Sequence, residues 1–197
     1  MSSPIADQEE LTIQNAAIEL FAKKGFNAST VVDIAEKAHV SRQSIYHHFS
    51  NKKQILVSLL ENIWQRLADE MYELSKNSEL DPLEKIDVMV DQTIDIFTDN
   101  PHLALVFFNE HNPVIRGDND SLNAHYVNYL KAFALVFEHG LQKDFINPHI
   151  DGRVFLFFVH GGLRCLLNEW AMHPDLFPIE KVRESIKYQI KHGILKW

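Results

Sequence analysis

Residues 30–53 have the sequence TVVDIAEKAHVSRQSIYHHFSNKK, which predicts a helix-turn-helix. Thr30 and Asp33 have the spacing of a capping box, in which the threonine side chain accepts from a free amide at the helix start. After a short turn, a second helix places Ile45 and Phe49 inward. Its remaining side chains therefore point outward, and most of them carry hydrogen-bonding groups.

The outward side chains of the second helix fit recognition of the DNA major groove, where donors, acceptors and forked guanidinium groups distinguish base pairs. Ser41 can cap this helix, and its N-terminal end is the part that enters the groove in such motifs. We therefore expect Arg42 and Gln43 to contact bases. Phosphates or sugars are the expected partners of Ser44, Tyr46, His47 and His48. In the alternative interpretation, Tyr46 and His48 pack on the first helix of the chain, whose apolar spacing begins near Ile13 and which is expected to end near residue 24, before Gly25.

Three linked segments resemble the N-terminal domain of TetR-family transcriptional regulators. They are A-A-x-x-L-F-x-x-x-G-F at 16–26, D-I-A-x-x-A-x-V-S at 33–41 and S-I-Y-H-H-F-x-N-K at 44–52. The resemblance covers about residues 9–56 without gaps, and it implies that Lys52 binds a DNA phosphate. His39 stands in the turn where the family usually has glycine. With the residues above, the expected DNA contacts are Thr30, Arg42, Gln43, Ser44, Tyr46, His47, His48 and Lys52.

Composition and charge narrow the class of protein further. The 197 residues are 46% hydrophobic and 11% aromatic, enough for a folded core, and the net charge is -8. The first 55 residues are neutral, so the acidic excess lies in the remainder. No apolar run reaches the roughly 18 residues of a membrane span, and the N-terminus has no signal-peptide pattern. We expect a cytoplasmic protein without membrane contact and, with Cys165 alone, without an internal disulfide.

Helical periodicity continues to the end of the chain and predicts an all-α fold. Further helices are expected at about 52–75, 82–98, 103–111, 122–140, 152–172 and 178–194. The domains expected from this pattern are a three-helix helix-turn-helix domain at 1–52 and a six-helix effector-binding and dimerisation domain at 53–197. Asp87, Asp91 and Asp95 share one helix face, which we interpret as exposed to solvent.

The second part contains more apolar and aromatic side chains than surface helices need, which suggests a lined cavity or a dimer interface. By resemblance, its middle helices enclose an effector pocket and the last two helices form a homodimer, with the Gly161-Gly162 pair allowing close approach. The expected effector-binding residues are aromatic rings or polar groups near apolar runs. They are Trp64, Phe107, Asn109, His111, Tyr126, Phe158 and His160.

The sequence thus predicts a ligand-responsive transcriptional regulator, most simply a repressor. It would bind a palindromic site on double-stranded DNA as a homodimer and be released by a small, mainly hydrophobic effector. The alternative is a small helical enzyme or metal-dependent sensor in which the helix-turn-helix only packs. No nucleophile elbow, glycine-rich phosphate loop or paired catalytic carboxylate is evident, and the spacing of the 11 histidines does not favour a metal site. We therefore expect no catalytic residue, metal or cofactor.

Overall fold

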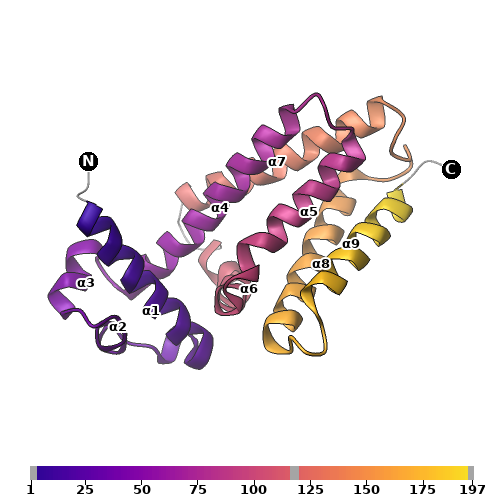
Figure 1. Cartoon of the computed structure of the whole chain (residues 1–197). Coiled ribbons are helices and arrows are strands. Elements are labelled where there is room, and N and C mark those ends of the chain that lie inside the picture. The colour runs from indigo at the N-terminus through magenta and orange to yellow at the C-terminus, as the bar shows by residue number, and fades with distance from the viewer. Residues whose placement is uncertain (1–3, 116–119, 195–197) are drawn as a thin grey trace. The chain divides into compact units, whose positions relative to one another are not determined.

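The computed structural model describes the backbone of residues 4–115 and 120–194, and the side chains of residues 8–110 and 120–193. Within these ranges the chain forms nine α-helices and no strand element, which confirms the all-α prediction (Figure 1). The helices are α1 Pro4–Ala28, α2 Val31–Ala38, α3 Arg42–His48, α4 Lys52–Lys76, α5 Pro82–Thr98, α6 Pro101–Ile115, α7 Asp120–Gln142, α8 Gly152–Met172 and α9 Ile179–Ile194.

The described residues divide into two compact units. The first contains residues of 1–62 and 102–119, and the second contains residues of 63–101 and 120–197. This packing division places α6 with the N-terminal helices, whereas the functional division expected from the sequence lies between residues 52 and 53. The functional division remains a prediction, because compact packing does not show which residues bind DNA or effector.

The first unit is built around the packing of α1 on α2 and α3. Ile13, Ala17, Ile34 and Ile45 are fully buried, as the helical spacing of the apolar residues predicts. Gly25 interrupts α1 with φ 80°, a conformation that favours glycine, and so turns the chain towards α2. The regular part of the first helix therefore ends near residue 24, as expected.

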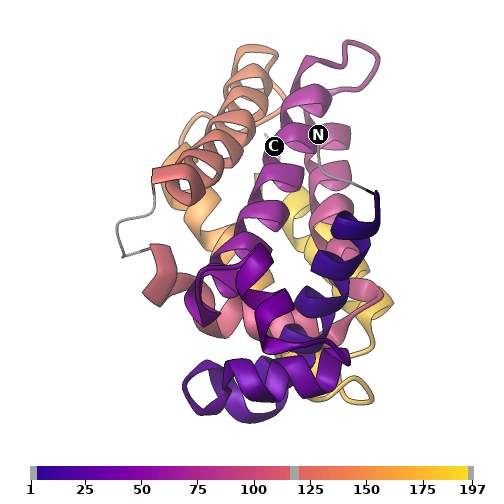
Figure 2. The ribbon, with the colours of Figure 1, turned by 90° about the vertical axis from the view of Figure 1, so that its left-hand side faces the viewer.

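In the second unit, α5 packs against both α7 and α9, and α8 packs against α7 and α9. α5 follows α4 through the connection at 77–81, so that the two helices form a hairpin (Figure 2). Asp81 caps α5 by accepting from the amides of Leu83 and Glu84, and Asp151 caps α8 in the same way. In both helices an aspartate stands directly before the first helical residue, where its carboxylate satisfies amides that have no partner within the helix.

The acidic stripe on α5 is not simply solvated, so that interpretation was wrong. Asp91 accepts from Arg183 at 2.9 Å and from Lys187 at 2.5 Å, and Asp95 accepts from Arg183 at 2.6 Å. Both cations lie on α9. The repeated carboxylates therefore hold α9 against α5, a pairing that spacing along one helix does not reveal.

α6 is longer than expected from the sequence, which predicted a helix over residues 103–111. The helix continues through Asn112 and Pro113 to Ile115. A proline removes one backbone donor, but it lies only two residues before the helix end, where few further turns depend on it. None of the helices in the described part is long and apolar enough to cross a bilayer.

Candidate nucleic-acid interface and effector site

α2 begins at Thr30, whose side chain and backbone complete the predicted capping box. The Thr30 hydroxyl accepts from the Asp33 amide at 3.1 Å and donates to the Asp33 carboxylate at 2.7 Å, and the Thr30 amide donates to the same carboxylate at 2.8 Å. Thr30 was expected to contact DNA. The residue is exposed, but its hydroxyl is already committed to the cap.

The turn between α2 and α3 requires a left-handed residue, and His39 supplies it. Its φ is 57° and ψ is 37°, and the next amide, of Val40, donates to the Ala35 carbonyl at 3.0 Å. Glycine adopts this conformation without the steric cost that a histidine carries. The structure thus places a histidine in the conformation for which glycine is favoured, so this turn is mildly strained.

α3 is held by a cap at its start and by apolar anchors along one side. The Ser41 hydroxyl accepts from the Ser44 amide at 3.0 Å, as predicted. Ile45 is fully buried and Phe49, which ends the helix, is 3% exposed. A helix of seven residues has little stability of its own, so these contacts fix where its outer face points.

The outer face of α3 carries Arg42, Gln43, Tyr46 and His47, all of them exposed. Tyr46 is 57% exposed, which differs from the alternative interpretation in which it packs on the first helix. A guanidinium, an amide, a phenol and an imidazole thus lie together on two turns of one short helix. Such groups can form paired hydrogen bonds with base edges and single bonds with phosphates.

Ser44 and His48 lie on a different side of α3, against α1. The Ser44 hydroxyl donates to one carboxylate oxygen of Glu9 at 2.6 Å, and His48 Nε2 lies 3.1 Å from the other. The side chain of His48 is only 7% exposed. Both residues were expected at the DNA, and for His48 the structure matches the alternative of packing on the first helix.

Lys52 is also occupied within the protein. Its ammonium group donates to the carbonyls of Phe26 at 2.6 Å and Ser29 at 2.7 Å, and lies 4.2 Å from the centre of the Phe26 ring. It thus closes the connection between α1 and α2 onto the start of α4. The resemblance implies a phosphate contact for this lysine, whereas here its donors are directed inward.

The other cations of the first unit are divided between paired and unpaired groups. Lys24 lies 2.8 Å from the Asp33 carboxylate and, with the bonds from Thr30, lowers the pKa of Asp33 to about 2. Lys37 lies 2.6 Å from Glu19 and lowers the pKa of that carboxyl. Arg42 and Lys53 are exposed and form no ion pair with the side chains that the structure describes. They are the cations most available to an incoming phosphate.

Three of the seven expected effector residues meet in the second unit. The ring of Trp64 lies 4.9 Å from Tyr126 and 5.9 Å from His160, centre to centre, and Tyr129 joins them at 5.2 Å from Trp64. We call Trp64, Tyr126, Tyr129 and His160 the ring cluster. Tyr129 was not among the expected effector residues, although it lies three residues after Tyr126 on α7.

Burial sets the ionisation of the ring cluster. Removal from water, with a smaller contribution from the charge of Arg164, lowers the pKa of His160 to about 4. Burial also raises the pKa of Tyr129 to about 12, although its hydrogen bond with Thr93 opposes the shift. The cluster is therefore uncharged near neutral pH, a setting that suits an apolar partner better than an ion.

The remaining expected effector residues are not in the ring cluster. Phe107 and Asn109 belong to α6 in the first unit, where Phe107 is buried beside Phe108 and Asn109 is exposed. The side chain of His111 lies outside the described residues. Phe158 is 78% exposed on α8.

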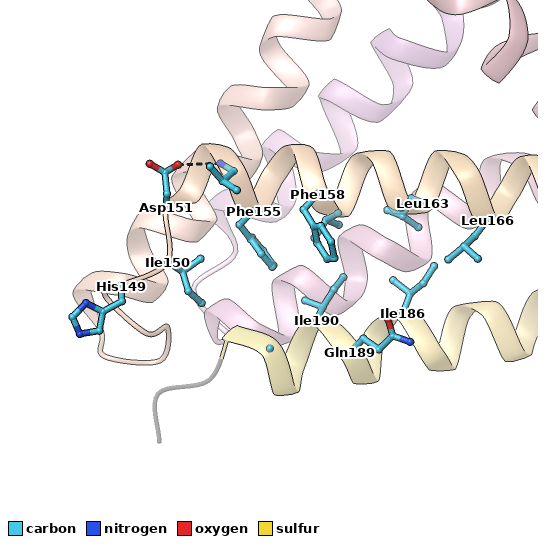
Figure 3. Close-up of a pocket in the computed structure, with 14 residues that line it drawn as sticks. His149, Ile150, Asp151, Phe155, Phe158, Leu163, Leu166, Ile186, Gln189 and Ile190 are labelled. Carbon is cyan, nitrogen blue, oxygen red and sulfur yellow. Dashed lines mark hydrogen bonds between the residues drawn. The ribbon is translucent and has the colours of Figure 1, made fainter.

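Phe158 instead lines a groove of about 590 Å³ between α8 and α9. Figure 3 shows Phe155 and Phe158 pointing from α8 towards Ile186 and Ile190 of α9. Polar groups lie mainly at one end, where the groove reaches residues 149–151. The lining consists of His149, Ile150, Asp151, Val154, Phe155, Phe158, Val159, Gly162, Leu163, Leu166, Ile186, Gln189, Ile190 and Gly193. We call this the α8–α9 groove.

Among the side chains that the structure describes, no group of three or more His, Cys, Asp or Glu is arranged to hold a metal ion. Three features of the described residues are therefore the candidate binding sites: the outer face of α3, the ring cluster and the α8–α9 groove.

Comparison with known proteins identifies a matching family model. Residues 13–59 match the family model described as bacterial regulatory proteins, tetR family. The matched segment includes all of α2 and α3, together with the Lys52 end of α4.

Other matches extend over nearly the whole chain, at 18–24% sequence identity. The chain is 24% identical over 187 residues to the fatty acid metabolism regulator protein of Bacillus subtilis, covering 93% of this chain and 94% of the relative. The structure of FadR from Bacillus subtilis in complex with stearoyl-CoA matches with a TM-score of 0.76 and 24% identity, covering 93% and 98% of the two chains. The ketosteroid transcriptional regulator KstR2 of Mycobacterium tuberculosis matches with a TM-score of 0.82 and 18% identity, covering 100% and 98%.

Proposed function

Because this chain belongs to the tetR family of bacterial regulatory proteins, we propose that it binds a palindromic operator as a homodimer and represses transcription until a small, mainly hydrophobic effector releases it. Its relatives are transcriptional regulators, and we propose that it has no catalytic activity of its own.

The exposed row on α3 is the observation that carries the DNA-binding proposal. Arg42 and Gln43 lie in the first turn and are free of partners among the described side chains, so they enter the major groove and contact bases. Tyr46 and His47, one turn further on, contact the backbone. The exposed Lys53 contributes the phosphate contact that Lys52 was expected to make.

The α8–α9 groove supports a dimer formed through the last two helices. Val154, Phe157 and Phe158 are 69%, 57% and 78% exposed, more apolar surface than a free helix face needs. A Cβ atom added at Gly161 or Gly162 would meet nothing within 4 Å, so a second helix has room to approach there. A twofold dimer presents two α3 helices to two half-sites of one operator.

The ring cluster supports a small, mainly hydrophobic effector, because its rings are uncharged near neutral pH. Of two similar regulators, one is solved in complex with stearoyl-CoA and the other is named for ketosteroids. Both compounds have large apolar parts. In our proposal the effector inserts beside Trp64 and Tyr126 and alters the course of α4, which begins beside the DNA-binding helices and contains Trp64. The effector favours one set of dimer geometries, and operator affinity falls because the spacing of the two α3 helices changes.

The experiment starts by selecting the preferred DNA of the purified protein from a randomised pool. Fluorescence anisotropy then compares that DNA with a scrambled duplex for the parent, Arg42→Ala and the control Lys131→Ala, which removes an exposed cation of α7. We expect Arg42→Ala to lose about tenfold or more in preference, the value of one bidentate base contact, with no change for the control. Failure of selection to yield any preferred sequence would reject the proposal.

Release is tested on the same DNA with stearoyl-CoA, the free fatty acid, a ketosteroid and coenzyme A. An apolar effector requires the acyl chain, so coenzyme A alone leaves the complex intact while at least one acyl compound or a steroid releases it. Release by coenzyme A as strongly as by stearoyl-CoA would contradict an apolar site.

A further inference from the structure

The carboxylate of Glu9 on α1 contacts two side chains of α3. One oxygen accepts from the Ser44 hydroxyl at 2.6 Å, and the other lies 3.1 Å from His48 Nε2. Ser44 and His48 are four residues apart, so they lie one above the other on one side of the helix. The carboxylate thus bridges one full turn of α3.

Two bonds one turn apart restrict motions that an apolar anchor permits. Ile45 and Phe49 are the buried apolar anchors of α3, and apolar contacts have no preferred direction, so small rolls and slides of the helix about them cost little. Each residue of an α-helix is about 100° around the axis from the next, as 3.6 residues per turn requires. A roll of a fraction of that angle moves the guanidinium of Arg42 away from a base edge.

We propose that Glu9 is a positioning residue for DNA recognition: its carboxylate fixes the rotation of α3 and thereby sequence discrimination, without touching DNA. This inference rests on the proposed function, since it concerns how the same helix distinguishes bases. It assigns Ser44 and His48 to the support of α3 rather than to direct phosphate contact.

The negative charge of Glu9 opposes DNA binding, whereas its hydrogen bonds support the helix that binds DNA. The hydrogen bonds from Ser44 and His48 lower the pKa of Glu9, so the group stays ionised near neutral pH. A negative charge beside a DNA-binding helix repels phosphates and weakens binding to any sequence. The charge of Glu9 therefore lowers affinity for any DNA, whereas its two bonds act on the choice between sequences.

The neighbouring Glu10 provides a matched control. Its carboxylate lies 3.9 Å from His48 Nδ1 and it has similar exposure, 42% against 36% for Glu9. Glu10→Ala and Glu9→Ala therefore remove equal charge from the same turn of α1, but only Glu9→Ala removes both close bonds. Glu9→Gln removes the charge and keeps groups able to bond with Ser44 and His48.

The experiment measures the ratio of affinities for the selected DNA and for a scrambled duplex at one salt concentration. Partial unfolding lowers both affinities by one factor and leaves the ratio unchanged, so the ratio separates positioning from loss of fold. We expect Glu9→Ala to lower the ratio about tenfold or more, and Glu10→Ala and Glu9→Gln to keep it within about threefold. Non-specific affinity should rise slightly in all three variants, because each loses a negative charge.

The outcomes separate this inference from the proposed function. If the parent prefers no sequence, the proposed function fails. If the parent discriminates and Glu9→Ala discriminates equally, or Glu10→Ala or Glu9→Gln loses as much as Glu9→Ala, the positioning role is overturned. If Glu9→Ala does not fold, Glu9→Asp takes its place. Aspartate keeps the charge but is one methylene too short to reach both Ser44 and His48, so we expect the same fall in the affinity ratio. An unchanged ratio in Glu9→Asp overturns the inference.

Discussion

Replacement of Lys52 by methionine separates two roles for this lysine. A methionine keeps most of the apolar stem but removes the ammonium, which donates to the carbonyls of Phe26 and Ser29 at 2.6 and 2.7 Å. Ser29 is only 2% exposed, so water replaces the lost donor poorly there. We therefore expect Lys52→Met to act mainly on stability.

The magnitude follows from the contacts. A hydrogen bond from a charged donor contributes about 1.5–3 kcal/mol, and a cation–π contact such as that with Phe26 about 0.5–1 kcal/mol. Lys52 is half-buried, which favours the lower end of each range, so two hydrogen bonds and one cation–π contact give a loss of about 3.5 kcal/mol. For a chain of this size the melting temperature should fall by about 7–14 °C.

Lys53→Met is the matched control, because Lys53 is adjacent and exposed. Its effect on stability should stay within about 0.5 kcal/mol. In anisotropy titrations at several salt concentrations, the slope of log K against log salt should fall by about 2 for the dimer, since each protomer loses one phosphate contact worth about 0.9. The reasoning is refuted if Lys52→Met melts like the parent and instead lowers the salt slope, because Lys52 would then bind phosphate.

The dimer and the ring cluster give two further predictions. Phe158→Asp should shift the protein from dimer to monomer in sedimentation velocity, because it places a charge in an apolar interface, whereas Leu135→Asp on the exposed side of α7 should not; equal behaviour of the two variants would move the interface elsewhere. Folding lowers the pKa of His160 from 6.5 to about 4, so between these pH values the unfolded chain binds a proton that the folded chain does not. The free energy of unfolding therefore falls as the pH decreases from 6.5 to 4. At 1.36 kcal/mol per pKa unit, the fall is about 3 kcal/mol at most. Denaturation of His160→Gln should show a smaller loss across that window, and a loss equal to the parent's would argue against a neutral, buried imidazole.

The local features of the fold could be predicted because their causes are local. Thr30, Ser41, Asp81 and Asp151 each cap a helix whose start their sequence context marks, and each does so in the structure. The left-handed turn at His39 was likewise expected from its position. The same holds for the outer face of α3, since helical spacing alone places Ile45 inward.

Contacts between distant parts of the chain were not predictable. Glu9 and Ser44 are 35 residues apart, and Lys52 bonds to backbone carbonyls, which carry no signal in the sequence. The lysine pattern of the family therefore suggested a phosphate contact where the structure shows an internal one. Asp91 likewise has a partner 92 residues away, so its spacing on α5 indicated only a shared face.

A crystal structure of the protein with its selected DNA tests sequence recognition by α3 most directly. We predict one dimer with its two α3 helices in successive major grooves about 34–36 Å apart, Arg42 and Gln43 within hydrogen-bonding distance of base edges, and Glu9 still bonded to Ser44 and His48. A complex in which α3 lies away from the groove, with Arg42 and Gln43 facing solvent, would contradict the proposed mode of recognition.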